Sequence, residues 1–228
     1  MQNLTLSLVQ SPLRNNSIRY SVSDKLANYS FKGEKQAAKN GDDDDDDLMV
    51  GTNNQPLADE GSLFLNGYVN HSSIMPVVMS IMLLNDAPNH LRPDFIKLFL
   101  NTPGGSLSAA FQLIDVMESS PIPVVTIATG MVASAGTLIL MTGHKGHRAA
   151  TKNATIMSHQ LSSGGGGTEG DLRAQMVFIN IASKQIMNHY AKCTKRSENY
   201  IRKNMISSND VFMTPEEAIK HGFIDIVI

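Results

Sequence analysis

A serine and a histidine near the middle of the chain have the residue types that nucleophilic catalysis requires. Ser134 lies within Gly130-Met-Val-Ala-Ser-Ala-Gly136, where small neighbours would let a substrate carbonyl approach its hydroxyl. A serine nucleophile needs a base, and His159 is a candidate because it follows an apolar segment and precedes the glycine run 164–167. The strict glycine-x-serine-x-glycine elbow is absent. On these residues alone, a serine packed among small residues in a helix is the favoured interpretation.

A second candidate feature is the glycine pair in Pro103-Gly-Gly-Ser106. Gly104 and Gly105 would join a buried strand to the N-terminus of a helix. Paired glycines allow positive φ and leave backbone N–H groups uncovered, which suits an anion or a developing oxyanion. A glycine pair is more often only a tight turn, so this signal is weak by itself.

No metal site is expected from the sequence. His144 and His147 lie in a polar turn without further ligands nearby, and surface roles suit them better. The six consecutive aspartates Asp42 to Asp47 lack the spaced ligands and turn glycine of a calcium loop. Their mutual repulsion predicts a solvated linker over residues 41–47 instead.

The elements that must position these residues alternate between strand and helix from residue 61 onward, which indicates an α/β protein. The serine, the glycine pair and the histidine each follow an expected strand. Thr214 is expected to cap the last helix, with a proline in its first turn. Expected strands cover residues 62–69, 94–100, 123–128, 148–151, 155–158 and 224–228, and expected helices cover 72–84 behind a serine cap, 107–117, 132–141, 171–191 and a segment opened by 214–217.

Composition narrows the function classes. The chain has 228 residues, 42% of them apolar, enough for a packed core. Its net charge of −2 includes −6 from the aspartate run, which leaves +4 over the rest, too little for a nucleic-acid binder. One cysteine, Cys193, excludes an internal disulfide and suits a reducing cytosol, and no stretch has the ~18 apolar residues of a membrane span. We therefore expect a soluble, cytoplasmic protein that binds neither nucleic acid nor membrane.

Four motifs, in order and with matching spacing, resemble the ClpP family of caseinolytic serine peptidases. The resemblance runs from about Gly61 to Ile228. The N-terminal sixty residues, rich in Asn, Ser and Asp, do not match convincingly and are expected to form a divergent extension (1–60) before the peptidase domain (61–228) of a divergent or viral homologue. The motifs are Asn101-Thr-Pro-Gly-Gly-Ser106, Gly130 to Gly136, Met157-Ser-His-Gln160, and Phe212 to Ala218 followed by His221-Gly-Phe-Ile-Asp225.

The resemblance implies both a fold and a mechanism. The fold would be crotonase-like, with repeated strand-strand-helix units and a protruding helix over Asp171 to Ala191. Ser134 would be the nucleophile and His159 the general base. The oxyanion and substrate-binding groups would be those of Gly104, Gly105 and Ala135, chiefly backbone N–H groups.

The resemblance also implies an assembly. Heptameric rings of one subunit would stack as a tetradecamer through the protruding helix, enclosing the active sites. An AAA+ unfoldase would use ATP to feed in unfolded polypeptides, and this chain itself would need no cofactor. The expected function is thus a self-compartmentalised, ATP-dependent Clp-type serine endopeptidase.

The chain departs from the family at the third member of the triad. Counting forward from Thr194, the family's aspartate falls on Asn204; counting back from Phe212, it falls on Ile206. Our hypothesis is a weakened Ser134–His159–Asn204 triad, because an amide can orient a histidine without supplying charge. The family's usual motifs also place methionine where Ala135 lies and isoleucine where Ser158 lies.

Two other functions are compatible with these observations. A catalytically weak or inactive ring subunit, serving assembly or gating, is motivated by the missing aspartate. An acyl-CoA hydratase or isomerase of the wider crotonase superfamily would also use a backbone oxyanion hole, but it would not need Ser134 and His159 together. A viral capsid-maturation protease would differ from the leading interpretation in substrate only.

Overall fold

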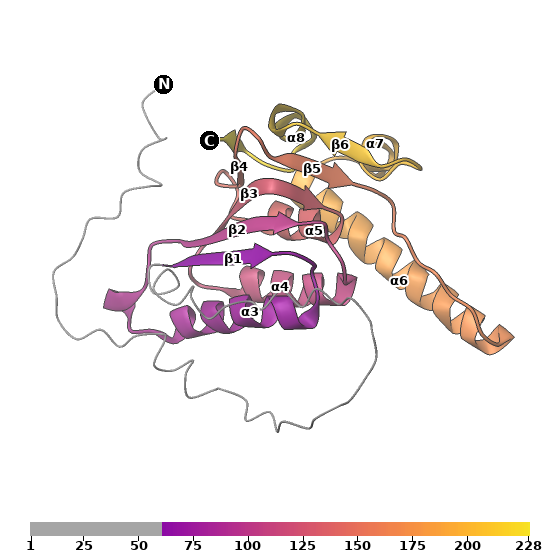
Figure 1. Ribbon diagram of the computed structural model, residues 1–228, viewed down its shortest axis with the longest axis horizontal. Helices are drawn as coiled ribbons and strands as arrows, with labels where there is room; N and C mark the ends of the chain where they lie inside the picture. The colour runs from indigo at the N-terminus through magenta and orange to yellow at the C-terminus, as the bar shows by residue number, and fades with distance from the viewer. Residues whose placement is uncertain (1–60) are drawn as a thin grey trace, which may run out of the picture.

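Strands and helices alternate along the chain as the sequence pattern predicts, and they build one sheet with helices against it (Figure 1). The computed structural model describes residues 61–228, so the expected extension 1–60 and acidic linker 41–47 lie outside the described residues. In chain order the elements are β1 (Ser62–Asn66), α3 (His71–Asp86), η2 (Asn89–Leu91), β2 (Ile96–Thr102), α4 (Leu107–Ser119), β3 (Val124–Ala133), α5 (Ala135–Thr142), β4 (Ala149–Ala150), β5 (Thr155–Ser158), α6 (Glu169–Thr194), α7 (Glu198–Asn204), β6 (Val211–Met213), α8 (Pro215–His221) and β7 (Ile226–Val227).

The sheet is organised around β3, which pairs with three other strands. Strands β1, β2, β3, β4 and β7 follow one another across the sheet, and each neighbouring pair is parallel. The last residues of β3 pair in parallel with β5, and β6 runs antiparallel to β5. Because parallel strands end at the same edge, the segments that follow β2, β3 and β5 come together there.

Helices α3, α4 and α5 cover one face of the sheet (Figure 1). Alternate residues of β2, namely Ile96, Leu98 and Leu100, are completely buried, as a strand with one face on the core requires. On α3 the buried residues Ile74 and Ile81 lie two turns apart on one stripe. The fold is mixed α/β, as the sequence pattern predicts, and it is consistent with the crotonase-like arrangement that the resemblance implies.

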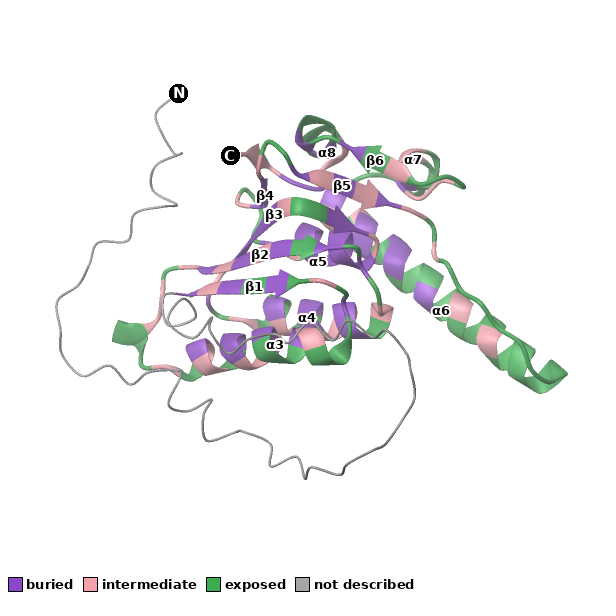
Figure 2. Ribbon diagram, viewed as in Figure 1, coloured by how far each residue is buried: buried purple, intermediate pink, exposed green. Residues whose placement is uncertain are grey.

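Helix α6 protrudes from the body of the molecule. A capping box between Thr168 and Asp171 starts it. Figure 2 shows its N-terminal part largely exposed, whereas its C-terminal part alternates between buried and exposed residues where it lies against the body of the molecule. Burial along α6 begins at Ala182 and recurs up to Thr194. This is the protruding helix that the resemblance implies, extended at both ends beyond the expected range.

Some expected boundaries are wrong, and the reasons are physical. The sequence predicts a helix from residue 132, but Val132 and Ala133 belong to β3 and pair with β5, because a short apolar run does not by itself distinguish a strand from a helix. Helix α3 is capped by Asn70 rather than by a serine, in a capping box with Ser73. Helix α7 and strand β6 were not predicted, since each is too short to show a period. The cap at Thr214 is confirmed.

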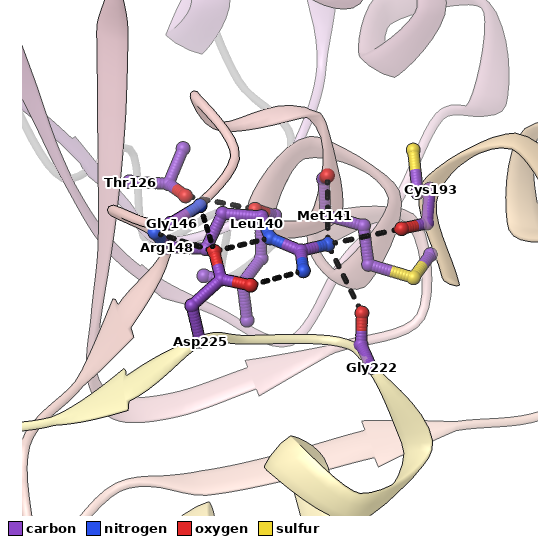
Figure 3. Close-up of polar contacts among 8 residues, drawn as sticks. All are labelled: Thr126, Leu140, Met141, Gly146, Arg148, Cys193, Gly222 and Asp225. Carbon is purple, nitrogen blue, oxygen red and sulfur yellow. Dashed lines mark hydrogen bonds and ion pairs between the residues drawn. The ribbon is translucent and has the colours of Figure 1, made fainter. Parts of the chain in front are cut away.

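An ion pair between the buried Arg148 and the partly buried Asp225 helps to fix the C-terminal strand to the rest of the fold (Figure 3). Nη2 of Arg148 lies 2.6 Å from Oδ1 of Asp225, and the Arg148 side chain is 4% exposed. The same guanidinium donates from Nη1 to the carbonyls of Gly222 (3.0 Å) and Cys193 (3.3 Å). One side chain therefore joins the β4 edge to the end of α6 and the turn after α8.

Candidate active site

Ser134 lies at the junction between β3 and α5, and its backbone adopts an unusual conformation. Its φ is 53° and its ψ is −121°, so it is a non-glycine residue in a region that L-residues rarely occupy. The surroundings hold it there: its N–H donates to the carbonyl of Met157 (2.9 Å), and its own carbonyl accepts from Oγ1 of Thr137 (2.6 Å). Strain of about 1–3 kcal/mol of this kind is common at functional sites.

His159 immediately follows β5, the strand that pairs with the end of β3. This pairing brings the serine and the histidine together across 25 positions of sequence. Nε2 of His159 lies 2.7 Å from Oγ of Ser134, a good hydrogen-bonding distance. When Nε2 carries no proton, the serine hydroxyl donates to it, which is the arrangement that general-base activation of a serine requires.

The glycine pair lies directly against Ser134. A Cβ on Gly104 would lie 2.6 Å from Cβ of Ser134, and a Cβ on Gly105 would lie 2.3 Å from the carbonyl oxygen of Val69. Both residues have positive φ, 95° and 144° respectively. Only glycine, which has no side chain, allows such a close approach without strain. The two glycines therefore let the turn pack closely beside Ser134.

Two backbone N–H groups near Ser134 are free to bind an oxyanion. Val69 bonds to the carbonyl of Gly104 (2.8 Å) and to the N–H of Ser106 (2.7 Å), which leaves the N–H of Gly105 without an acceptor among residues 61–228. Ala135 is the first residue of α5, a position whose N–H has no acceptor within its own helix. The arrangement can therefore stabilise negative charge that develops next to the serine.

Asn204 lies at the end of α7, close to the strand that leads into His159. Ser158, which precedes the histidine, donates a hydrogen bond to the carbonyl of Met205, which follows Asn204. The Asn204 amide, however, donates from Nδ2 to the carbonyl of Tyr200 (2.9 Å). Among the described residues no hydrogen bond joins Asn204 to His159, so its role in orienting the imidazole stays a prediction.

A cavity of about 200 Å³ opens beside the serine and the histidine. Gly105, Ser134, Ala135 and His159 all line it. Much of the remaining wall is apolar, formed by Leu107, Leu138, Leu161 and Ile186. Such a pocket suits an apolar side chain held next to the reactive hydroxyl.

The other hollow of note lies elsewhere and lacks this chemistry. It measures about 410 Å³ and lies around β5, β6 and the start of α8. Lys152, Phe212 and Glu216 are among its lining residues, which include no serine, cysteine or histidine. Throughout residues 61–228, no three His, Cys, Asp or Glu side chains gather as a metal-ligand set.

Sequence reasoning missed three polar residues beneath the candidate pair: Thr137, Ser158 and Tyr190. The spacing of Tyr190 within the expected helix 171–191 fits an apolar stripe, so the sequence predicts a core residue there. The only sequence signal was at Ser158, where the family's usual motif has isoleucine.

Comparisons with known proteins agree with these features. A sequence model of the family described as Clp protease matches residues 47–228. The ATP-dependent Clp protease proteolytic subunit 4, chloroplastic, of Arabidopsis thaliana is 38% identical over 155 residues, 68% of this chain and 52% of that protein. This chain thus spans about half the length of the chloroplast subunit.

Two bacterial relatives are covered more fully. The ATP-dependent Clp protease proteolytic subunit of Deinococcus radiodurans is 36% identical over 151 residues, 66% of this chain and 72% of that protein. The corresponding subunit 2 of Mycolicibacterium paratuberculosis is 34% identical over 172 residues, 75% of this chain and 84% of that protein.

Proposed function

The chain belongs to the Clp protease family, and from this premise we propose that it is a serine endopeptidase whose nucleophile is Ser134. The observation that carries the proposal is the 2.7 Å contact between Oγ of Ser134 and Nε2 of His159. The adjoining glycine turn supports it, because acyl transfer needs an oxyanion site as well as an activated hydroxyl.

In the proposed reaction, His159 removes the Ser134 proton as Oγ attacks the scissile carbonyl carbon. The tetrahedral intermediate collapses as the imidazolium gives that proton to the leaving amine, and the C–N bond breaks. The acyl-enzyme remains, and a water molecule, deprotonated in turn by His159, hydrolyses its ester bond and frees Ser134.

The oxyanion of each tetrahedral intermediate would accept hydrogen bonds from the N–H groups of Gly105 and Ala135. Gly104 would serve this site indirectly, by letting the turn approach Ser134. Losing one such donor typically costs a factor of about 10²–10³ in kcat.

The cavity beside Ser134 supports a preference for an apolar residue on the acyl side of the cleaved bond. Four aliphatic side chains contribute to its wall. A charged side chain placed there would lose much of its hydration and would find no Asp, Glu, Lys or Arg among the lining residues to pair with, which is costly. We therefore expect little hydrolysis after aspartate or lysine.

We further propose that the subunits form homo-oligomeric heptameric rings, stacked as a tetradecamer, that enclose the active sites. Support comes from the exposed apolar residues on the N-terminal part of α6, since monomers rarely expose such patches. Unfolded polypeptides would be the substrates, delivered by an AAA+ unfoldase that consumes the ATP, so that this chain needs no cofactor.

We propose the cytoplasm as its location. Within residues 61–228, none of the helices combines the length and the apolar character that crossing a bilayer demands.

The test is hydrolysis of a fluorogenic peptide with an apolar residue before the cleaved bond, together with the native mass of the assembly. We expect turnover by the wild type, a loss of at least a thousandfold in Ser134→Ala, and the same native mass for both proteins. Equal rates for the two proteins would eliminate Ser134 as the nucleophile. No turnover by an intact wild-type ring would favour an inactive ring subunit.

A further inference from the structure

Three buried hydroxyl side chains lie beneath the candidate Ser134–His159 pair: Thr137 on α5, Ser158 on β5 and Tyr190 on α6. Thr137 and Ser158 are completely buried and Tyr190 is 2% exposed. Burying a hydroxyl is costly unless it is hydrogen-bonded, so a group of three in an apolar interior calls for an explanation.

Their contacts run from the nucleophile to the strand that carries the base. Oγ1 of Thr137 donates to the carbonyl oxygen of Ser134 (2.6 Å) and lies 3.5 Å from the hydroxyl oxygen of Tyr190. Burial raises the pKa of Tyr190, whereas its contacts with the hydroxyls of Thr137 and Ser158 oppose that shift. Ser158, the residue before His159, donates in turn to the carbonyl of Met205.

The Tyr190 hydroxyl thus lies next to Thr137, which bonds to Ser134, and next to Ser158, which precedes His159. Its ring is fixed by an edge-to-face contact with Phe223, whose centroid lies 5.8 Å away. Tyr190 is also held by its helix, because Ile186 and Thr194, about one turn before and after it on α6, are buried as well. A rigid residue in this position can set the separation between the Ser134 turn and the end of β5.

A residue that sets this separation matters because Asn204 does not hold the imidazole of His159 in place. No hydrogen bond joins Asn204 to His159 within residues 61–228, so the imidazole relies on the backbone that carries it. The hydroxyl of Ser158 gives that backbone a polar contact, in a position where the family's usual motif has an isoleucine. A displacement of about 1 Å at a reacting pair can cost a hundredfold in rate.

We propose that Tyr190 is a positioning residue, whose hydroxyl, between those of Thr137 and Ser158, holds Ser134 and His159 at proton-transfer distance. The inference rests on the proposed peptidase function for its kinetic consequence, but its geometric consequence is independent of turnover. It also makes α6, the helix proposed to join two rings, a direct support of the active site.

The test is Tyr190→Phe, which removes the hydroxyl and keeps the ring against Phe223. We expect kcat for peptide hydrolysis to fall about tenfold while KM stays within twofold. In a crystal structure of the variant, the distance between Oγ of Ser134 and Nε2 of His159 should exceed 3.5 Å. Thr137→Val, which breaks the same chain of contacts from the other side, should have the same two effects.

The matched control is Thr126→Val. Thr126 is completely buried, and its hydroxyl donates to the carbonyl of Leu140 (2.8 Å) at the far end of α5. This variant should lose similar stability but keep kcat within twofold. Wild-type turnover in Tyr190→Phe, or equal kcat losses in Tyr190→Phe and Thr126→Val, would overturn the inference. If the wild type itself has no turnover, the proposed function fails, and an unchanged Ser134–His159 distance in Tyr190→Phe would overturn the inference separately.

Discussion

At Asn204 the chemistry of a single side chain decides how strong the proposed base can be. The amide oxygen of asparagine can accept a hydrogen bond from an imidazole, but it carries no full charge to stabilise the imidazolium that forms during acylation. In this structure the Nδ2 of Asn204 donates a hydrogen bond to the carbonyl of Tyr200. The proposed peptidase therefore works without a carboxylate at this position.

Replacing Asn204 should change turnover in opposite directions, depending on the charge. We expect Asn204→Asp to raise kcat for peptide hydrolysis by about tenfold or more, because a carboxylate near His159 would stabilise the imidazolium, and Asn204→Ala to lower it severalfold. Steady-state kinetics on a fluorogenic peptide would measure both. If neither variant differs from the wild type, Asn204 has no part in the mechanism.

Among single residues, the sequence could identify only those whose types and motifs are specific to a reaction. Ser134, His159 and the glycine pair were expected in one site from motifs, and the structure brings them together. Tyr190 and Thr137 could not be found, because an aromatic residue or a threonine at helical spacing is indistinguishable from a core residue. Ser158 gave a signal only as a departure from the family's usual isoleucine.

Among the elements, β7 is held by its pairing with β4 and by the adjacent ion pair between the buried Arg148 and the partly buried Asp225. Burial by itself would raise the pKa of Asp225, but the hydrogen bonds and the charge of Arg148 outweigh burial and leave the pKa below its usual value. The ionised pair is therefore favoured at neutral pH. The contribution of a carboxylate with a lowered pKa is present above about pH 4 and is lost as the pH falls through its pKa in the folded protein.

Asp225→Asn should lower the free energy of unfolding by about 3–5 kcal/mol, because it leaves the guanidinium of Arg148 buried without a counter-charge. The control is Glu118→Gln, since Glu118 pairs with Lys192 on the surface and such pairs contribute at most about 1 kcal/mol. Urea unfolding at pH 7 would compare the two variants. Equal losses would contradict the structural role of the Arg148–Asp225 pair.

A second element-scale prediction concerns His189 on α6, whose Nε2 lies 3.0 Å from the carbonyl oxygen of Leu138 on α5. Burial lowers the pKa of His189. Below about pH 6.5 the unfolded chain therefore binds a proton that the folded protein resists, so stability falls as the pH decreases.

This loss between pH 7.5 and pH 5.5 should be no more than about 1.4 kcal/mol and should shrink in His189→Gln. Urea unfolding of both proteins at the two pH values would measure it. A wild-type pH dependence that is unchanged in His189→Gln would show that the packing of α6 on α5 does not depend on a neutral His189.

The order of strands and helices could be predicted from hydrophobic pattern, but their pairing could not. Alternation indicated an α/β fold, and the structure has one. That β3 continues to Ala133 and pairs with β5 beyond its contact with β4 depends on contacts distant in sequence. This continuation is what brings Ser134 and His159 to the same edge, so the least predictable pairing is the one on which the candidate site depends.

For the whole molecule, the notable surface is the N-terminal part of α6, where several apolar side chains of a single subunit are exposed to solvent. Leu172, Met176, Val177, Phe178 and Ile181 are each at least 45% exposed. A charged residue among them would oppose burial against a second ring, because an unpaired charge resists desolvation.

Phe178→Asp should therefore break the proposed double ring into single rings or smaller species while leaving the subunit folded, since this side chain is 60% exposed. Asn180→Asp adds the same charge at an exposed position of the same helix and should leave the assembly intact. Native mass spectrometry would measure the mass of the assembly in both variants, and circular dichroism would test whether the subunits are folded. An intact assembly in Phe178→Asp would show that the apolar residues of α6 do not hold rings together.

Covalent labelling of the nucleophile tests the central claim most directly. A fluorophosphonate probe should add once per chain, on Ser134, and the adduct should be absent in Ser134→Ala and form at least a hundred times more slowly in His159→Asn. Intact-mass measurement followed by peptide mapping gives the site and the rate. A wild-type protein that stays unlabelled, or labelling that is unaffected by loss of His159, would contradict a hydroxyl activated by that imidazole.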